Sequence, residues 1–279
     1  MRVGVIARMD VEAALSLARQ AVELLKQRGV DCLIEEGVAA KLGLKGVRVE
    51  DMEVDAVLSI GGDGTILRSL KRLRHPAPIL GIKLGKVCFL GEAEPEEVEE
   101  VVEKLAAAKF FVEEVMKLRA ELQGGVEVDA VNEVAVVTNR PAKTVELKVA
   151  VGEVEVFSGL ADGVIVATPT GSTGYAMSAH GPVVDPSLEA HLIVLLSPLN
   201  LSYRPLVASA SREVEVRVEG PEAAVVVDGE AVGKVGEGGW VRVRRSPFKA
   251  KFIRLSQDRA NFFRRLKGLF EARTMVRKA

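Results

Sequence analysis

Over the first hundred residues, short apolar runs alternate with segments whose apolar residues recur at helical spacing. Three segments of the second kind predict helices: Val11–Arg28, which ends before Gly29, Thr65–Leu73 and Pro95–Ala108. The apolar runs predict four strands, namely Val3–Ala7, Val30–Ile34, Val54–Ile60 and Ile79–Ile82. Alternating strands and helices favour a parallel sheet with helices on both faces, which is an α/β domain.

The pattern changes after about residue 110, where short valine-rich runs alternate with charged residues or end at glycines. This predicts an antiparallel or mixed β domain with strands at Val145–Val149, Val154–Phe157, Val214–Val218, Ala224–Val227 and Val241–Val243. Helical spacing returns from Asp258 to Leu269. We therefore expect an N-terminal α/β domain over residues 1–109 and a β-rich domain over 110–257. A C-terminal helix over 258–279 is expected to dock back on the first domain.

Composition supports two folded domains and argues against several classes of partner. A length of 279 residues is long for one core. The net charge of −1 lacks the basic excess of a sequence-independent nucleic-acid binder. No apolar run reaches the roughly 18 residues of a membrane span, and the N-terminus turns polar too early for a signal peptide. Cys32 and Cys88 fit no metal spacing, so a cytoplasmic protein is expected. Four Asn and four Gln beside 28% charged residues indicate heat adaptation.

A glycine-aspartate turn follows the third predicted strand, where the chain reads L-S-I-G-G-D-G-T-I-L. Glycines let backbone N–H groups approach an anion, and the helix that follows points its positive end at the same place. These features suit phosphate, but the carboxylate of Asp63 repels it. Asp63 is therefore expected to accept a proton from a hydroxyl nucleophile or to help hold a metal that bridges phosphates. The alternative is a tight turn in which Asp63 caps the helix.

A second candidate segment is T-P-T-G-S-T, which follows the apolar run Val164–Ala167. Its hydroxyls, on Thr168, Thr170, Ser172 and Thr173, are dense enough to bind a heterocycle or a ribose without adding charge. Tyr175, close behind, offers a ring that can pack against a base. The alternative is a Ser/Thr-rich surface turn.

A third candidate is the pair Asn132-Glu133 inside the apolar run A-V-N-E-V-A-V-V. Polar side chains there need partners if they are buried. Adjacent strand residues point to opposite faces, so both can face a ligand only where the strand is bulged or ends. From these residues alone, a satisfied structural pair is the favoured interpretation.

These segments together resemble the NAD kinase family, whose members phosphorylate NAD to NADP. The matching segments are Gly61–Thr65, Gly81–Leu90, Asn132-Glu133, Asp162–Pro182 and Asp228-Gly229-Glu230, in family order over almost the whole chain. The G-G-D-G-T turn is shared with lipid kinases and phosphofructokinases. The T-P-T-G-S-T segment together with Asn132-Glu133 is far more specific.

The resemblance implies a Rossmann-like, phosphofructokinase-like N-terminal domain and a β-rich C-terminal domain, with NAD between them. Asp63 would take the proton from the 2′-hydroxyl of the adenosine ribose. Asn132 and Glu133 would bind the adenosine part, and Asp162 would lie near the nicotinamide. The phosphates would be bound by Gly61, Gly62, Gly64, Thr65 and Lys83. The nucleotide pocket would include Gly64, Thr170, Thr173, Gly174, Tyr175, Ala176, Met177 and Ser178.

Several positions depart from the family pattern. Lys83 stands in place of the family Asn, and we predict that its ammonium lies near the phosphates. There it would partly replace the basic residue that the family has at the position of Leu160. Lys143 falls where some members place a basic or polar contact. Glu230 turns an amide contact into an acidic one.

Two further departures replace glycines of the family pattern. Cys88 takes the place of the glycine in L-G-F, and His180 stands where glycine is frequent. Histidine tolerates positive φ better than most residues.

By resemblance, the phosphoryl donor is ATP or polyphosphate. Mg²⁺ or another divalent metal would be held through phosphates, because no side-chain cluster suggests a metal site. The assembly would be a homodimer or homotetramer with no nucleic-acid or membrane partner. One alternative is a lipid or sphingoid kinase, which would need Phe262–Leu269 as a membrane-surface helix with a basic face. The other is a non-catalytic NAD(P)-binding regulator, which would have no use for Asp63 as a base.

Overall fold

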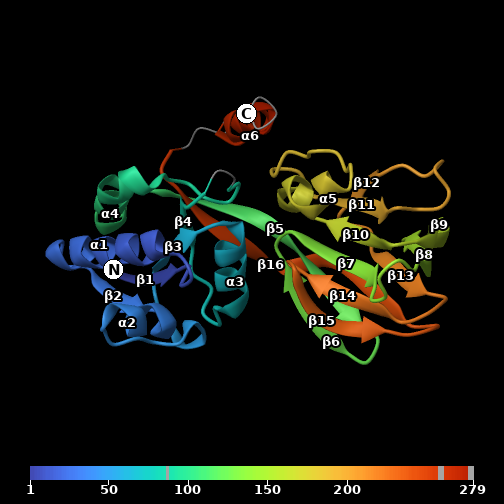
Figure 1. Ribbon diagram of the computed structural model, residues 1–279, viewed down its shortest axis with the longest axis horizontal. Coiled ribbons are helices and arrows are strands. Elements are labelled where there is room, and N and C mark those ends of the chain that lie inside the picture. Colours follow the sequence, from blue (N-terminus) through green and yellow to red (C-terminus); the bar gives the residue numbers. More distant parts are fainter. Residues whose placement is uncertain (86–87, 257–260, 276–279) are drawn as a thin grey trace. The chain divides into compact units, whose positions relative to one another are not determined.

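The computed structural model describes residues 1–85, 88–256 and 261–275. The chain divides into two compact units (Figure 1). The first contains Met1–Glu114 and the chain from Lys251 onward, and the second contains Val115–Ala250. An N-terminal α/β domain and a β-rich C-terminal domain were both predicted, and both are confirmed.

The first unit is built on four parallel strands in the order β2-β1-β3-β4. Their bounds are β1 Arg2–Ala7, β2 Asp31–Ile34, β3 Ala56–Gly61 and β4 Ile79–Lys83. The helices are α1 Glu12–Gln27, α2 Glu36–Leu42, α3 Asp63–Arg72, α4 Val98–Ala106 and α6 Asn261–Met275, with short 3₁₀ turns η1 Val49–Asp51 and η2 Pro95–Glu97.

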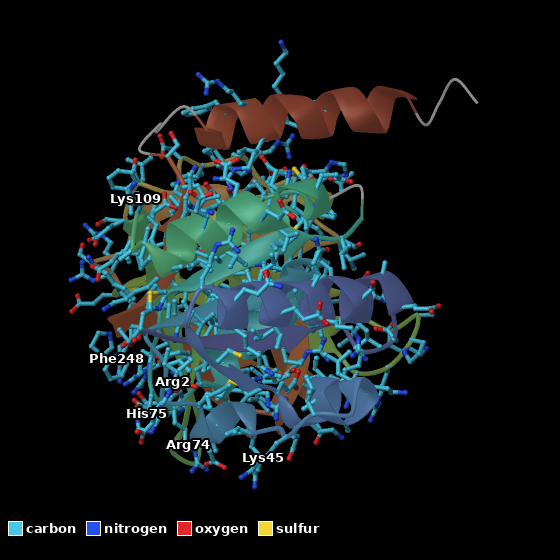
Figure 2. All side chains as sticks on the ribbon, turned by 90° about the vertical axis from the view of Figure 1, so that its left-hand side faces the viewer. Arg2, Lys45, Arg74, His75, Lys109 and Phe248 are labelled. Atoms are coloured by element: carbon cyan, nitrogen blue, oxygen red, sulfur yellow. The ribbon has the colours of Figure 1, made fainter. Side chains whose placement is uncertain are left out.

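Helices cover both faces of this parallel sheet. One face carries Val3, Val5 and Leu58, which are fully buried in one cluster with apolar residues of α1, α2 and α4. Since successive strand residues point to opposite faces, Gly81 of β4 lies on the other one. A Cβ at Gly81 would come within 2.5 Å of Ile66 Cδ1, so α3 packs directly on that face. Charged and polar side chains cover the outside, as Figure 2 shows for Arg2, Lys45, Arg74, His75 and Lys109.

The second unit consists mainly of strands in two sheets. One is antiparallel with the order β12-β11-β10-β7-β14-β15. The other contains β16-β13-β8-β9 with the β5-β6 hairpin, and both long strands β5 and β16 also continue into the first unit. The bounds are β5 Phe111–Leu122, β6 Val126–Ala130, β7 Glu133–Thr138, β8 Val145–Val151, β9 Val154–Ala161, β10 Gly163–Ala167, β11 Ala190–Leu196, β12 Leu206–Ser209, β13 Val214–Val218, β14 Ala223–Val227, β15 Glu230–Val235 and β16 Trp240–Arg254; the short helices are η3 Thr170–Thr173 and α5 Tyr175–Ser178.

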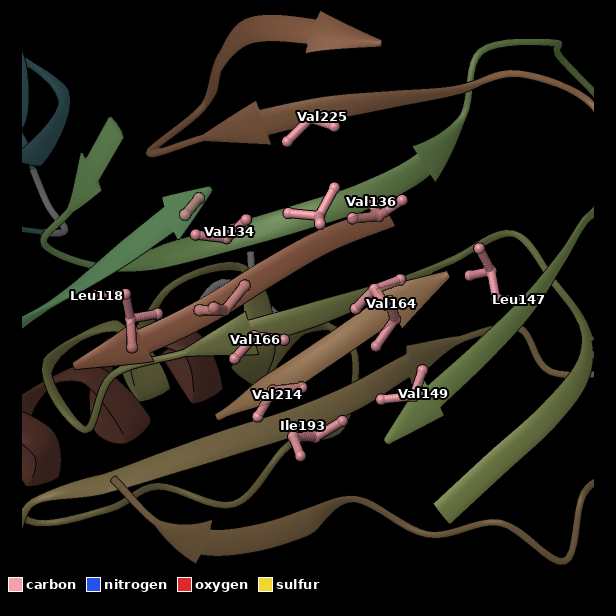
Figure 3. Close-up of a cluster of buried hydrophobic side chains, with 14 of the residues drawn as sticks. Leu118, Val134, Val136, Leu147, Val149, Val164, Val166, Ile193, Val214 and Val225 are labelled. Atoms are coloured by element: carbon pink, nitrogen blue, oxygen red, sulfur yellow. The ribbon is translucent and has the colours of Figure 1, made fainter. Parts of the chain in front are cut away.

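The core of the second unit lies between these two sheets (Figure 3). Val134 and Val166 come from the six-stranded antiparallel sheet, and Leu147 and Val214 come from the other. Strand β13 alternates buried valines with more exposed charged residues. This period-2 pattern is the one that predicted the strands from sequence.

Helix α6 contacts the first unit through Arg265, whose Nη1 donates to Gly91 O at 3.0 Å. The beginning of the predicted C-terminal helix, residues 258–260, and its end, residues 276–279, lie outside the described residues. Among the helices that the structure describes, none is long and apolar enough to cross a membrane.

Candidate active site

The glycine-aspartate turn lies where β3 passes into α3, at the carboxyl end of the parallel sheet. Strand β3 ends at Gly61 and α3 begins at Asp63. A Cβ at Gly61 would come within 2.5 Å of Thr65 Oγ1 and 3.3 Å of Arg8 Cβ. Gly61 is therefore required by packing, whereas the positions of Gly62 and Gly64 have open space around them, which leaves their backbone accessible to a ligand.

The carboxylate of Asp63 does not cap its helix, because no side-chain cap hydrogen bond forms at the start of α3. It accepts three hydrogen bonds from consecutive residues instead. Oδ1 accepts from Leu90 N at 2.9 Å and Cys88 Sγ at 2.9 Å. Oδ2 accepts from Phe89 N at 3.0 Å. The capping interpretation is therefore wrong, and no sequence pattern had indicated that residues 88–90 hold Asp63.

A cavity of about 190 Å³ lies beside this turn, between the end of β1 and the side of α3. The strand order reverses between β1 and β3, and crevices at such switch points are the usual ligand sites of open α/β sheets. Arg8 is paired with Asp10, and Arg72 is paired with Glu35 and Glu50. Arg68 also lines the cavity and makes no ion pair within the described part of the chain.

Lys83, the last residue of β4, forms an ion pair with Glu94. Its side chain also lies over Gly91, where an added Cβ would come within 2.8 Å of Lys83 Cγ. The ammonium is thus neutralised by a carboxylate in this structure, and the expected phosphate contact stays a prediction.

In the second unit, Asn132 and Glu133 face the same place. Strand β7 begins at Glu133, so Asn132 precedes the strand, and its side chain need not point to the opposite face from that of Glu133. A Cβ at Gly174 would lie 3.4 Å from Glu133 Oε2 and 3.5 Å from Asn132 Nδ2. Asn132 Oδ1 and Glu133 Oε2 are buried and have no hydrogen-bond partner among the described residues. The interpretation as a satisfied structural pair is therefore wrong.

Asp228 holds the backbone of this pair, a role that the sequence analysis missed. Its Oδ1 accepts from Asn132 N at 2.8 Å and Glu133 N at 3.1 Å, and its Oδ2 accepts from Val131 N at 2.8 Å. Asp228 has φ of 48° in the turn between β14 and β15. An Asp-Gly pair between two valine-rich runs signals such a hairpin turn, but nothing in the sequence says which backbone the carboxylate meets.

Burial raises the pKa of two neighbouring carboxyl groups, those of Glu133 and Asp228. The pKa of Glu133 is raised to about 8, first by burial and then by the charge of Asp228. Burial also raises the pKa of Asp228, although its three backbone hydrogen bonds act in the opposite direction. Glu133 is consequently protonated at neutral pH and can donate a hydrogen bond to a ligand oxygen.

The T-P-T-G-S-T segment is buried, so it is not a surface turn. Most of its hydroxyls bond to the protein: Thr168 Oγ1 donates to Val131 O at 2.7 Å, Thr173 Oγ1 donates to Thr170 O at 3.2 Å, and Ser172 Oγ accepts from Val184 N at 3.0 Å. Thr170 Oγ1 is the exception, since it is buried without a partner among the described residues. The ligand contacts expected for this segment stay a prediction.

The helical turn that follows, α5, carries several of the predicted nucleotide contacts. Ala176 is buried, whereas Tyr175 and Ser178 are exposed and Met177 is half-buried. Tyr175 and Ser178 line a second cavity of about 450 Å³, together with His180, Tyr203 and Arg204. His180 has φ of 63°, so the histidine adopts the left-handed backbone expected where the family often has glycine.

The remaining candidates lie at different ends of the antiparallel sheet. Ala167 of β10 pairs with Glu133, whereas Thr138 N donates to Asp162 O at the opposite end of the same two strands. Five residues of extended chain place Asp162 about 17 Å from Ala167, so Asp162 and Glu133 do not contact the same group. Lys143 follows Thr138 in the next loop, and Leu160 is exposed on β9. Glu230 pairs with Val227 at the Glu133 end.

Both halves of the chain match family models. Residues 3–110 match the ATP-NAD kinase N-terminal domain, and residues 131–255 match the ATP-NAD kinase C-terminal domain. The NAD kinase of Methanopyrus kandleri is 42% identical over 275 residues, covering 96% of each chain. That of Thermococcus gammatolerans is 42% identical over 265 residues, covering 92% of this chain and 95% of the relative.

Solved structures give the same result. The crystal structure of an NAD kinase from Archaeoglobus fulgidus in complex with ATP has a TM-score of 0.78 and 34% identity, covering 96% of this chain and 99% of that chain. Yeast NADH kinase complexed with NADH has a TM-score of 0.90, covering 97% of this chain and 87% of that chain, but at 19% identity it shows the fold alone.

A glycine-rich turn at the carboxyl end of a parallel sheet, joined to a β-rich unit in which described polar atoms are buried without partners, indicates a two-domain enzyme that binds a nucleotide. With both domain models matched, the chain belongs to the NAD kinase family. It is an enzyme that phosphorylates NAD, giving NADP. The lipid-kinase and regulator alternatives are set aside by this membership, and the heat-adapted composition fits its archaeal relatives.

Proposed function

We propose that Asp63 is the general base for the 2′-hydroxyl of the adenosine ribose and that Asn132, Glu133 and Thr170 bind the adenosine part of NAD. The observation that carries this proposal is that three polar atoms, Asn132 Oδ1, Glu133 Oε2 and Thr170 Oγ1, are buried without a hydrogen-bond partner among the described residues. They belong to the start of β7 and to η3, which approach each other closely at Gly171. Unpartnered buried polar atoms are costly. A ribose or a base that supplies their hydrogen bonds removes that cost.

The proton transfer follows from the geometry of Asp63. A carboxylate offers about four acceptor positions, and residues 88–90 occupy three of them. The open position on Oδ2 accepts the hydroxyl proton while the ribose oxygen forms its bond to phosphorus and the bond from phosphorus to the leaving phosphate breaks. The backbone of Gly62 and Gly64, which has open space beside it, and the N-terminus of α3 stabilise phosphate charge there.

We propose ATP as the donor, since the Archaeoglobus fulgidus relative is described in complex with ATP. The cavity at the switch point is the candidate site for its nucleotide, and its lining includes Arg68, which forms no ion pair with any described residue. Among the described residues, no group of three or more His, Cys, Asp or Glu can hold a metal. We propose that Mg²⁺ is carried by the donor phosphates.

The test is a coupled assay in which NADP formation is read by a strictly NADP-dependent dehydrogenase, with ATP, other nucleotides and polyphosphate as donors. Asp63→Asn should lower kcat by about 10²- to 10⁴-fold. The NH₂ group of the new asparagine faces one backbone N–H donor and cannot accept from it, so one of the three hydrogen bonds is lost. The thermal midpoint should fall by about 2–4 °C for each kcal/mol by which this loss lowers the free energy of unfolding.

The matched control is Asp51→Asn, at an exposed position of η1, which should leave both quantities unchanged. A folded Asp63→Asn enzyme with near-normal kcat would overturn the assignment of the base. Formation of NADP from polyphosphate but not from ATP would instead correct the donor.

We further propose a homodimer or homotetramer acting in the cytoplasm. Exposed Leu201, Leu206 and Val207 on or beside the edge strand β12 support contact with a second copy, because an edge strand offers unpaired backbone groups. Both cysteines are free thiols, as a reducing compartment favours. Activity per chain should fall on dilution as light scattering reports monomers. A fully active monomer would contradict the proposal.

A further inference from the structure

The side chain of Cys88 makes the third contact to the Asp63 carboxylate. The backbone N–H groups of Phe89 and Leu90 donate to one oxygen each, and any residue type except proline at those positions supplies them. The Cys88 thiol adds a side-chain donor to Oδ1, with Sγ 2.9 Å from that oxygen. Oδ1 thereby has two donors and Oδ2 has one.

Packing around the thiol places it there. A Cβ at Gly91 would lie 2.9 Å from Cys88 Sγ, so only the absence of a side chain at Gly91 leaves room for the sulfur. The carbonyl of Gly91 is in turn held by Arg265 of α6. The thiol is consequently confined between the Gly91 backbone and the carboxylate.

The thiol stays protonated at neutral pH, so it remains a hydrogen-bond donor. Burial, the negative charge of Asp63 and the hydrogen bond to it raise the pKa of Cys88 to about 12, while Gly91 N–H and Lys83 act weakly in the other direction. A protonated thiol donates to the carboxylate, whereas a thiolate would repel it.

We propose that Cys88 is a positioning residue of the reaction: its S–H fills the remaining acceptor position of Oδ1 and so directs the substrate hydroxyl to Oδ2. The proposal rests on the role of Asp63 proposed above. Rotation about the last bond of an aspartate is only weakly restricted. An open position on Oδ1 would let water bind there and would let the carboxylate present either oxygen.

The test compares Cys88→Ala with Cys88→Ser. Alanine removes the donor, and serine keeps one. Cys88→Ala should lower kcat by about 10- to 150-fold, the effect of one hydrogen bond to a charged group, with KM for NAD unchanged. Cys88→Ser should restore kcat. Wild-type kcat in Cys88→Ala, or an equal loss in both variants, would refute the proposal.

A second measurement reads the hydrogen bond without activity. In a Cys32→Ser background, Cys88 is the one remaining cysteine, and its S–H stretch in the infrared should be lowered by the bond to the carboxylate. Asp63→Ala should return the band to the position of a free thiol. A free-thiol band in the Cys32→Ser protein would refute the contact.

The two proposals fail in distinguishable ways. If Asp63→Asn keeps normal kcat, the assignment of the base is wrong and the positioning role falls with it. If Asp63→Asn is inactive while Cys88→Ala is fully active, only the role of Cys88 is wrong.

Discussion

Replacing Glu133 by glutamine should stabilise the substrate-free enzyme, and increasingly so as the pH rises. Glu133 is buried beside Asp228, and its pKa is raised to about 8 from the ordinary 4.5. Between these two values the folded chain holds a proton that the unfolded chain has released. The free energy of unfolding therefore falls as pH rises through this window and becomes constant above about pH 8.

The magnitude follows from the two pKa values. A pH of 7 lies about 2.5 units above the pKa of Glu133 in the unfolded chain, and each unit corresponds to about 1.4 kcal/mol. Taking up the proton on folding at pH 7 therefore costs about 3 kcal/mol. A glutamine has the same shape and needs no proton. Glu133→Gln should therefore equal the wild type near pH 4.5 and exceed its unfolding free energy by up to about 3 kcal/mol at pH 7.

The assay is urea unfolding from pH 5 to pH 8, followed by tryptophan fluorescence. Trp240 is the one tryptophan of the chain and lies in the second unit with Glu133, so the signal reports the relevant unit. Glu153→Gln, in the exposed turn between β8 and β9, is the matched control and should show no pH-dependent difference. A constant difference between Glu133→Gln and the wild type over this range would refute a protonated Glu133.

Three further outcomes are expected. His191 is fully buried, and burial lowers its pKa to about 4 from 6.5, so the stability that depends on the neutral imidazole is complete above pH 6.5 and is lost as pH falls toward 4. His191→Leu should remove this acid sensitivity in thermal melts, and an unchanged pH profile of the melting temperature would contradict the reasoning. Lys83→Ala should raise a KM, for the donor or for NAD, whereas exposed Lys45→Ala should not; unchanged KM values for both substrates would exclude a phosphate contact. Arg68→Ala should raise KM for ATP alone, and an equal effect in exposed Arg74→Ala would point to general charge.

Local pattern was sufficient to predict most of the framework. Alternating apolar runs and helical spacing predicted the parallel sheet and its helices, and valine alternation predicted Val214–Val218 with the observed bounds. Helix α2, Glu36–Leu42, was missed because seven residues span too few turns to show a period. Strand β16 was predicted only at Val241–Val243, since the charged residues after Val243 hide its continuation to Arg254.

The chemistry of the site was only partly predictable, because it depends on contacts between distant residues. The turn around Asp63 was found from its glycines, but its three donors come 25 to 27 residues later in the chain. Asp228 meets Val131–Glu133 across 95 to 97 residues. Hydroxyl density in T-P-T-G-S-T suggested ligand contacts, although folding uses most of those hydroxyls internally.

Gly171 illustrates what a mutational scan of this enzyme would reveal. An added Cβ there would come within 2.2 Å of Asn132 O, a backbone atom that itself accepts from Thr168 N. Even alanine at this position should therefore push η3 away from Asn132. In a library of single variants, Gly171 should tolerate as little change as Asp63, although it carries no functional group. Intolerance to substitution at this position would report the close approach of two backbones, and it should not be read as evidence of a catalytic role.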